Sequence, residues 1–167
     1  MDPFTFIIVN QILTMNTGIL IKKRQAVVET ICYLYSILFL YTASSKLMGL
    51  SDFKLQLGRS QLLGPFAEWI AWIVPLLEIV LAILLLTKVY RLVALYGSLI
   101  LMSLFTGYIV WMLRFSDHIP CSCGGVISSM GWETHLVFNA FWIVLALIGI
   151  VLMENTRKKS TSKNTVQ

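Results

Sequence analysis

Four long runs of apolar residues dominate the pattern of hydrophobic and polar positions along this chain. They extend over residues 27–48, 67–87, 92–113 and 134–153, and short polar stretches separate them. Each run has about the ~20 residues that an α-helix needs to cross the hydrocarbon core of a bilayer. The pattern therefore predicts an all-α membrane protein that is built as a bundle of four transmembrane helices.

The composition supports a lipid environment for these runs. Hydrophobic residues make up 57% of the 167 residues and charged residues only 13%, and a soluble domain of this size cannot bury so much apolar surface. The remainder is too short for a soluble domain. We expect a transmembrane domain over residues 25–153, an interfacial or disordered N-terminal arm over 1–24, and a polar basic tail over 154–167.

The distribution of Lys and Arg indicates how the bundle is oriented. Most of these residues flank the runs on the side that also holds both termini: Lys22, Lys23, Arg24, Lys88, Arg91, Arg157, Lys158, Lys159 and Lys163. Because basic flanks are retained in the cytoplasm, both termini are predicted to be cytoplasmic. The loop between the third and fourth runs then lies outside, where disulfides persist. These flanks account for the net charge of +5, which gives no reason to invoke nucleic acid.

Two cysteines, Cys121 and Cys123, lie in this predicted outer loop and are followed by two glycines. A disulfide between cysteines so close in sequence is expected to be strained, and strain makes it easier to reduce. It would also add little stability through chain entropy. We favour a redox-active pair in which one cysteine is the attacking thiolate and the other resolves. An inert or structural pair and a metal-binding pair remain open.

Two histidines near the loop bear on these alternatives. His118 and His135 could join Cys121 and Cys123 as ligands of zinc or copper. Alternatively, His135 lies at the outer start of the fourth run and could lower the pKa of a loop thiol. The structural alternative is an interhelical hydrogen bond formed by His135 and Asn139, which are four residues apart on one helix face.

The third cysteine, Cys32, lies near the inner end of the first run. Met48, at the outer end, follows 16 residues later, which is roughly 24 Å along a helix. Cys32 is therefore too far away to pair with the loop cysteines of the same chain. We expect it to be a buried, small apolar residue.

Charged residues also occur within or beside the apolar runs. Glu78 lies near the middle of the second run, where a carboxylate is costly and suggests function. Its candidate roles are a proton relay, a hydrogen-bond partner for a quinone and a tie between helices. Lys46 and Glu68 lie near the outer boundary, where we expect them to pair or to extend toward water. Residues 49–66, between these runs, could form a short interfacial helix.

Taken in order, these features resemble the DoxX-like superfamily of four-helix membrane proteins, and in particular its MauE branch, often called redox-associated membrane proteins. The resemblance covers roughly residues 25–153. It rests on Ser45-Lys46-Leu47, Pro75, Glu78, the basic turn from Lys88 to Arg91, the segment from Pro120 to Gly125, Gly131-Trp132, His135 and Asn139.

The resemblance implies a role in disulfide formation or thiol redox outside the cytoplasm, at the inner membrane of a bacterial cell. MauE members are tied to the maturation of methylamine dehydrogenase, a disulfide-rich periplasmic enzyme, and DoxX relatives are linked to quinone-coupled sulfur oxidation. An extracytoplasmic thiol protein is the expected partner, and a quinone is a candidate cofactor.

Other features keep two further functions open. Vitamin K epoxide reductase homologues share a four-helix plan, but their membrane Cys-x-x-Cys motif is absent from this sequence. This absence argues against quinone reduction by a buried dithiol. A non-catalytic membrane assembly factor and a metal-handling membrane protein are the alternative functions.

Overall fold

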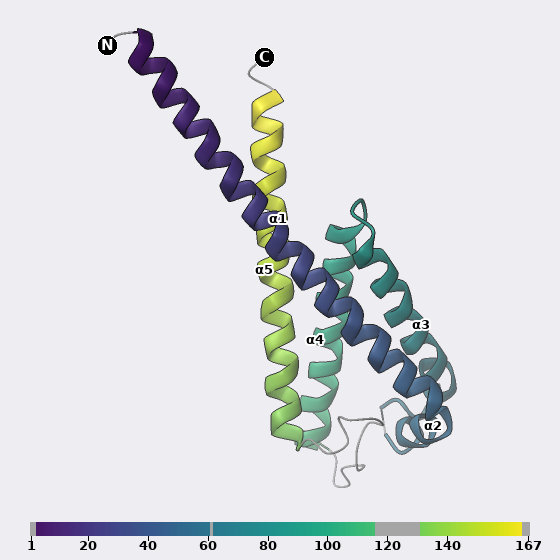
Figure 1. The fold of residues 1–167 in the computed structure, drawn as a ribbon. Helices are drawn as coiled ribbons and strands as arrows, with labels where there is room; N and C mark the ends of the chain where they lie inside the picture. Colours follow the sequence, from purple (N-terminus) through teal and green to yellow (C-terminus); the bar gives the residue numbers. More distant parts are fainter. Residues whose placement is uncertain (1–2, 61, 116–130, 165–167) are drawn as a thin grey trace.

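The computed structural model describes residues 3–60, 62–115 and 131–164, and within these ranges the chain is helical apart from short turns (Figure 1). The elements in order are α1 (Pro3–Met48), α2 (Leu50–Gly58), the short 3-10 helix η1 (Gly64–Phe66), α3 (Ala67–Leu86), α4 (Arg91–Phe115) and α5 (Trp132–Asn164).

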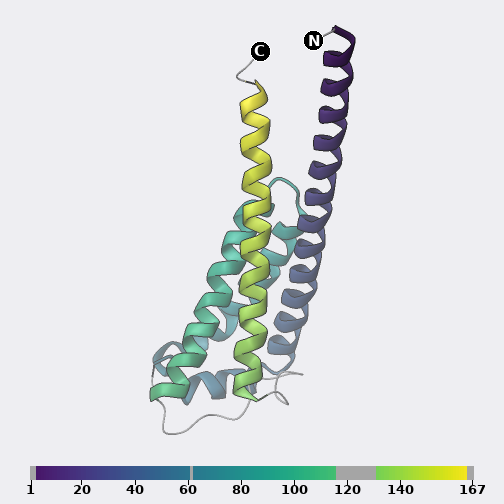
Figure 2. The same ribbon diagram turned by 90° about the vertical axis from the view of Figure 1, so that its left-hand side faces the viewer.

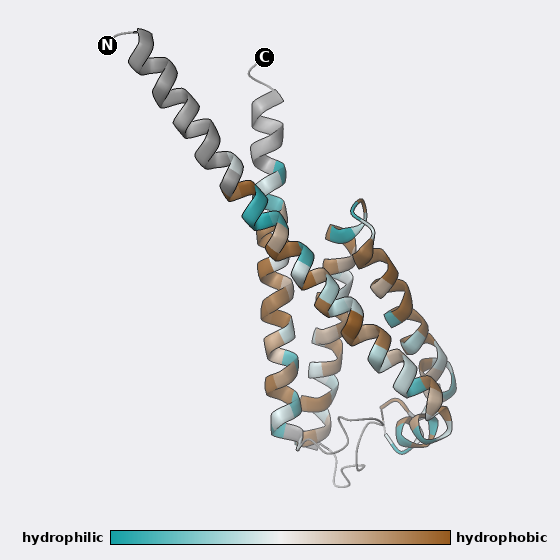
Figure 3. Ribbon diagram, viewed as in Figure 1, coloured by the Kyte–Doolittle hydropathy of each residue, from teal (hydrophilic) through white to brown (hydrophobic). Residues whose placement is uncertain are grey.

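Four segments of these helices are long and apolar enough to cross a membrane. They are Leu20–Met48, Gly64–Leu86, Arg91–Arg114 and Glu133–Arg157. Figure 3 shows apolar residues along the middle of the bundle and polar residues toward its ends. The prediction of an all-α bundle with four transmembrane helices is confirmed.

Both ends of the chain lie at the same end of the bundle. Figures 1 and 2 show the start of α1 and the end of α5 extending beyond the other helices on one side, and α2 lying at the opposite end. The first helix is continuous from Pro3, so no break separates an arm over residues 1–24 from the first span. The cytoplasmic side of the bundle and the interfacial position of this arm stay predictions.

The core lies where α1 packs against α3 and α5, and α4 against α5. Two hydroxyl groups on α1 reinforce these contacts. Tyr35 donates a hydrogen bond to the carbonyl of Trp142 on α5 at 2.5 Å, and Ser36 donates to the carbonyl of Ala82 on α3 at 3.1 Å. Cys32, one turn before, is a buried free cysteine, as predicted.

The helix α2 confirms the short helix predicted between the first two spans. Phe53 and Leu57 on α2 pack against Ala71 on α3, and Trp69 and Trp72 on α3 remain exposed. In this way α2 caps the end of the bundle at which α1 finishes and α3 starts (Figure 1).

Candidate functional site

The most distinctive polar contact inside the bundle is an ion pair between Lys46 and Glu78. Lys46 lies in the last turn of α1, and Glu78 lies near the middle of α3. The Lys46 Nζ atom is 2.6 Å from Glu78 Oε1, and the Glu78 side chain is only 1% exposed. The ammonium group also lies over the ring of Phe105 on α4, 5.4 Å from its centroid. The pair thus joins three helices within the membrane-spanning region.

The prediction that Lys46 pairs with Glu68 is wrong. Glu68, in the first turn of α3, is exposed and pairs instead with Lys54 of α2 at 3.3 Å. The reason is depth: α1 packs along α3 so that its last turn reaches the middle of α3. Glu68 therefore belongs to the surface contact between α2 and α3, whereas Lys46 offsets the buried charge of Glu78.

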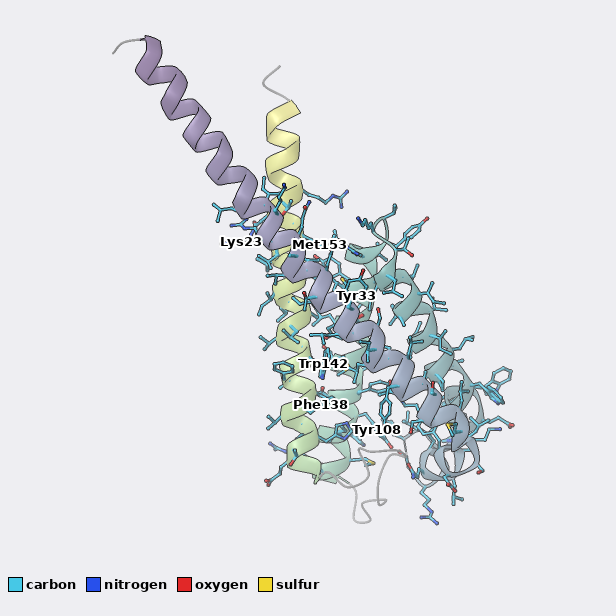
Figure 4. All side chains as sticks on the ribbon, in the orientation of Figure 1. Lys23, Tyr33, Tyr108, Phe138, Trp142 and Met153 are labelled. Carbon is cyan, nitrogen blue, oxygen red and sulfur yellow. The ribbon has the colours of Figure 1, made fainter. Side chains whose placement is uncertain are left out.

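A cavity of about 500 Å³ surrounds this ion pair. Residues from α1, α2, α3, α4 and α5 line it, and the lining is largely apolar. Tyr108 on α4 and Phe138 on α5 are two of its lining residues, and Figure 4 shows them in the part of the bundle away from the termini. Its polar lining residues come from all five helices: Thr42, Ser45, Lys46, Gln56, Glu78, Ser103, Tyr108, His135 and Asn139.

Several buried polar atoms at the cavity have no hydrogen-bond partner among the described residues. They are Glu78 Oε2, Asn139 Nδ2 and Gln56 Oε1. Glu78 and Asn139 are almost completely buried. Because an unsatisfied buried polar atom costs about 1–3 kcal/mol, such a group in a natural protein calls for a physical reason.

His135 and Asn139, both predicted from sequence, lie in the first two turns of α5 and line this cavity together with Glu78 and Lys46. The structure thus brings four predicted residues to one site. The Asn139 side-chain N–H makes no bond to His135, because it has no partner among the described residues. Modulation of the thiols by His135 stays a prediction.

The cysteine pair itself lies outside the described residues, as does His118. The connection that carries them leaves α4 after Phe115 and enters α5 at Trp132. Met112, in the last turns of α4, and His135, in the first turn of α5, both line the cavity. The two helix ends that flank this connection therefore border the cavity.

The metal alternative also stays a prediction. Within the described ranges, no three His, Cys, Asp or Glu side chains are close enough together to hold an ion. The predicted ligand set of His118, Cys121, Cys123 and His135 has only His135 inside those ranges.

A second ion pair lies toward the other end of the bundle, and the sequence analysis missed it. Arg91, at the start of α4, donates to Glu29 on α1 at 2.9 Å and to the carbonyl of Leu85 at 3.3 Å. Arg91 is buried although it opens its helix. In the sequence, Arg91 marks only the basic turn that indicates the orientation of the bundle. The signal that could have revealed the pair is the acidic Glu29 in the basic flank of the first span.

A comparison with protein-family models gives a match over most of the chain. The family described as methylamine utilisation protein MauE matches residues 24–152. The chain belongs to the MauE family. The matched range includes the Lys46–Glu78 pair, the cavity and the cysteine pair. Membership in this family, together with the four apolar helices, makes the chain a multi-pass membrane protein in a lipid bilayer, with a family link to methylamine utilisation. A search of curated proteins and a search of solved structures found no significant match.

Proposed function

We propose that this MauE-family protein supports thiol/disulfide redox chemistry outside the cytoplasm and so assists the disulfide-dependent maturation of a partner protein. Cys121 and Cys123 are the reacting residues. The observation that carries the proposal is their position: a Cys-x-Cys pair lies in a polar connection between two transmembrane helices, α4 and α5. The two helix ends that flank it border a cavity with a buried ion pair.

The chemistry is thiol–disulfide exchange with a second protein. A thiolate of one protein attacks the disulfide of the other protein and forms a mixed disulfide between them. The second thiol of the attacking protein then resolves this mixed disulfide. Two electrons are exchanged in total, because one dithiol becomes a disulfide while the other disulfide becomes a dithiol. The small, strained ring expected for a Cys121–Cys123 disulfide favours this transfer role over a structural one.

The distribution of charge supports an outer location for this chemistry. The start of α1 and the end of α5 lie at one end of the bundle (Figure 2), and most Lys and Arg residues flank the helices there. Since basic flanks face the cytoplasm, the cysteine connection faces the periplasm of a bacterial cell, where disulfides persist.

Labelling with a membrane-impermeant maleimide tests this proposal. Intact cells are exposed to oxidant or reductant and then labelled, and the number of modified thiols is read from the shift on a gel. We expect Cys121 and Cys123 to react after reduction and to be protected after oxidation, while Cys32, buried in the core, stays unlabelled in both. An unchanged labelling pattern in the two conditions would refute the redox role.

Replacing both loop cysteines separates this function from a non-catalytic assembly factor. The Cys121→Ser, Cys123→Ser variant is expected to reach the membrane in normal amounts and to lose partner maturation. Cys32→Ser is the matched control and should retain it. If the double variant supports maturation as well as the control does, the protein acts without thiol chemistry.

A further inference from the structure

We propose that the cavity of the bundle holds one acyl chain of a membrane phospholipid, which enters between α3 and α4. The site consists of described residues only, and the inference does not depend on the thiol function proposed above. It rests on the separation of two helices, on the apolar lining of the space between them, and on the basic residues at the same end of the bundle.

The helices α3 and α4 pack tightly at one level and separate toward the end of the bundle where α2 lies. At the tight level, a Cβ on Gly97 would lie 2.7 Å from Leu81 Cδ2. About three turns further along α4, a Cβ on Gly107 would meet nothing within 4 Å. Figure 1 shows the two helices diverging from the turn that joins them. The cavity therefore occupies the wide part of the gap between them.

This wide part is open to the outside of the bundle. On α4, the lining residues Leu104, Gly107 and Trp111 are exposed, and Leu104 is 64% exposed. On α3, the lining residues Ile70 and Val74 are partly exposed. All five belong to segments that are long and apolar enough to cross a bilayer, so hydrocarbon chains surround the opening. A phospholipid chain thus reaches the cavity without leaving the apolar phase.

The lining favours an apolar occupant over water or an empty space. The Glu78 side chain is 1% exposed and is paired with Lys46, and Thr42 is also a hydrogen-bond partner of this carboxylate. Most of the remaining lining is apolar, whereas an ordered water needs about three polar partners. An empty cavity of about 500 Å³ would forfeit dispersion contacts of the side chains around it. An acyl chain avoids both costs.

The cavity also has the direction that a phospholipid requires. It extends from α2, which caps the end of the bundle, to Glu78 near the middle of α3, as an acyl chain runs from the interface toward the middle of a bilayer. Arg59, at the C-cap of α2, and Arg114, in the last turn of α4, are exposed at this same end. Because a guanidinium group binds phosphate through paired hydrogen bonds, we expect the lipid phosphate to lie there.

Native mass spectrometry tests the proposal on the full chain. Protein in a mild detergent is delipidated and incubated with dioleoylphosphatidylglycerol or with dihexanoylphosphatidylglycerol, and the phospholipids that stay bound are counted. The two lipids share a headgroup, but the short chains cannot extend to the middle of the bundle. We expect one dioleoyl lipid per protein and no dihexanoyl lipid. Equal retention of both would show that only the headgroup binds, and retention of neither would show that the cavity holds no phospholipid; either result overturns the proposal.

Filling the cavity locates the bound chain. Gly107→Leu puts a side chain where a Cβ meets no neighbour, and it is expected to abolish retention of the dioleoyl lipid. Gly18→Leu is the matched control because this exposed helical glycine also meets nothing within 4 Å but does not line the cavity. Val74→Phe narrows the same space from α3 and replaces Gly107→Leu if that variant fails to fold by circular dichroism. Equal retention by the cavity variant and by Gly18→Leu would overturn the site.

The headgroup end is tested by the energy needed to release the lipid in the mass spectrometer. Arg59→Gln combined with Arg114→Gln should release the dioleoyl lipid at a lower collision energy than the wild type does, because the phosphate loses its charged partners. Lys88→Gln is the control, since it removes an exposed lysine from the turn between α3 and α4 at the other end of the bundle. If the double variant holds the lipid as firmly as Lys88→Gln does, the proposed orientation of the phospholipid is wrong.

Discussion

A single buried carboxylate, Glu78, organises the polar interior of this protein. Its partner Lys46 is 2.6 Å away and only 16% exposed, and the ring of Phe105 covers the ammonium group. Removing one member of a buried pair leaves an uncompensated charge, whereas removing both can be nearly neutral. For Lys54 and Glu68, removing one member leaves no buried charge, because Glu68 is 81% exposed.

Replacing Lys46 therefore has a larger effect than replacing Lys54. We expect Lys46→Met to lower the free energy of unfolding by on the order of 3 kcal/mol, and Lys54→Met by less than about 1 kcal/mol. Adding Glu78→Leu to Lys46→Met should recover most of the loss. Denaturant unfolding in detergent measures all three, and equal effects of the two lysine variants would show that the Lys46–Glu78 pair is not buried as described.

At the scale of helices, two glycines of α4 have different environments although their sequence contexts look alike. The sequence favours close helix packing at both. At Gly97 an added Cβ would lie 2.7 Å from Leu81 Cδ2 of α3, so close packing is present. At Gly107 it would meet nothing within 4 Å, because that glycine borders the cavity. Small residues favour close helix packing, but Gly107 borders open space instead.

This contrast gives a prediction with its own internal control. Gly97→Ala should lower the free energy of unfolding by about 1 kcal/mol, since the buried Leu81 side chain must move. Gly107→Ala should leave it unchanged or raise it slightly, because alanine favours the helix and meets no neighbour. Thermal unfolding of both variants in one detergent is the measurement, and a larger loss for Gly107→Ala would contradict the packing of α3 on α4.

The helices of this protein could be predicted from its sequence, but the contacts between them could not. The four spans were predictable because each needs ~20 apolar residues, and the pattern depends on the residues of that span alone. The partner of Lys46 was not, because Glu78 is 32 residues away and the contact depends on how far α1 reaches along α3. The Glu29–Arg91 pair, whose members are 62 positions apart in the sequence, could not be predicted for the same reason.

The set of residues that meet at the cavity could not be predicted from the sequence either. Glu78, Lys46, His135 and Asn139 were each singled out from their type and depth in the membrane. Their convergence at one site, and the participation of Gln56 from α2, follow from the packing of five helices. No periodicity in a single helix carries that information.

At the scale of the whole molecule, the bundle separates two polar regions. The Glu29–Arg91 pair lies toward the end at which α5 finishes, and the cavity lies toward the end at which α1 finishes and α5 begins. Glu29 and Lys46 are 17 residues apart on α1, which is roughly 25 Å of helix. The cavity is therefore remote from the end of the bundle that holds the Glu29–Arg91 pair.

Trapping of a mixed disulfide tests the central claim most directly. Cells that express Cys121→Ser or Cys123→Ser, with the other loop cysteine intact, are quenched with acid and analysed on non-reducing gels. The account predicts that one of these variants accumulates a covalent adduct with a partner protein, which a reductant releases and which the double variant lacks. If neither single variant forms more adduct than the double variant, the cysteine pair does not exchange disulfides and the proposed function is wrong.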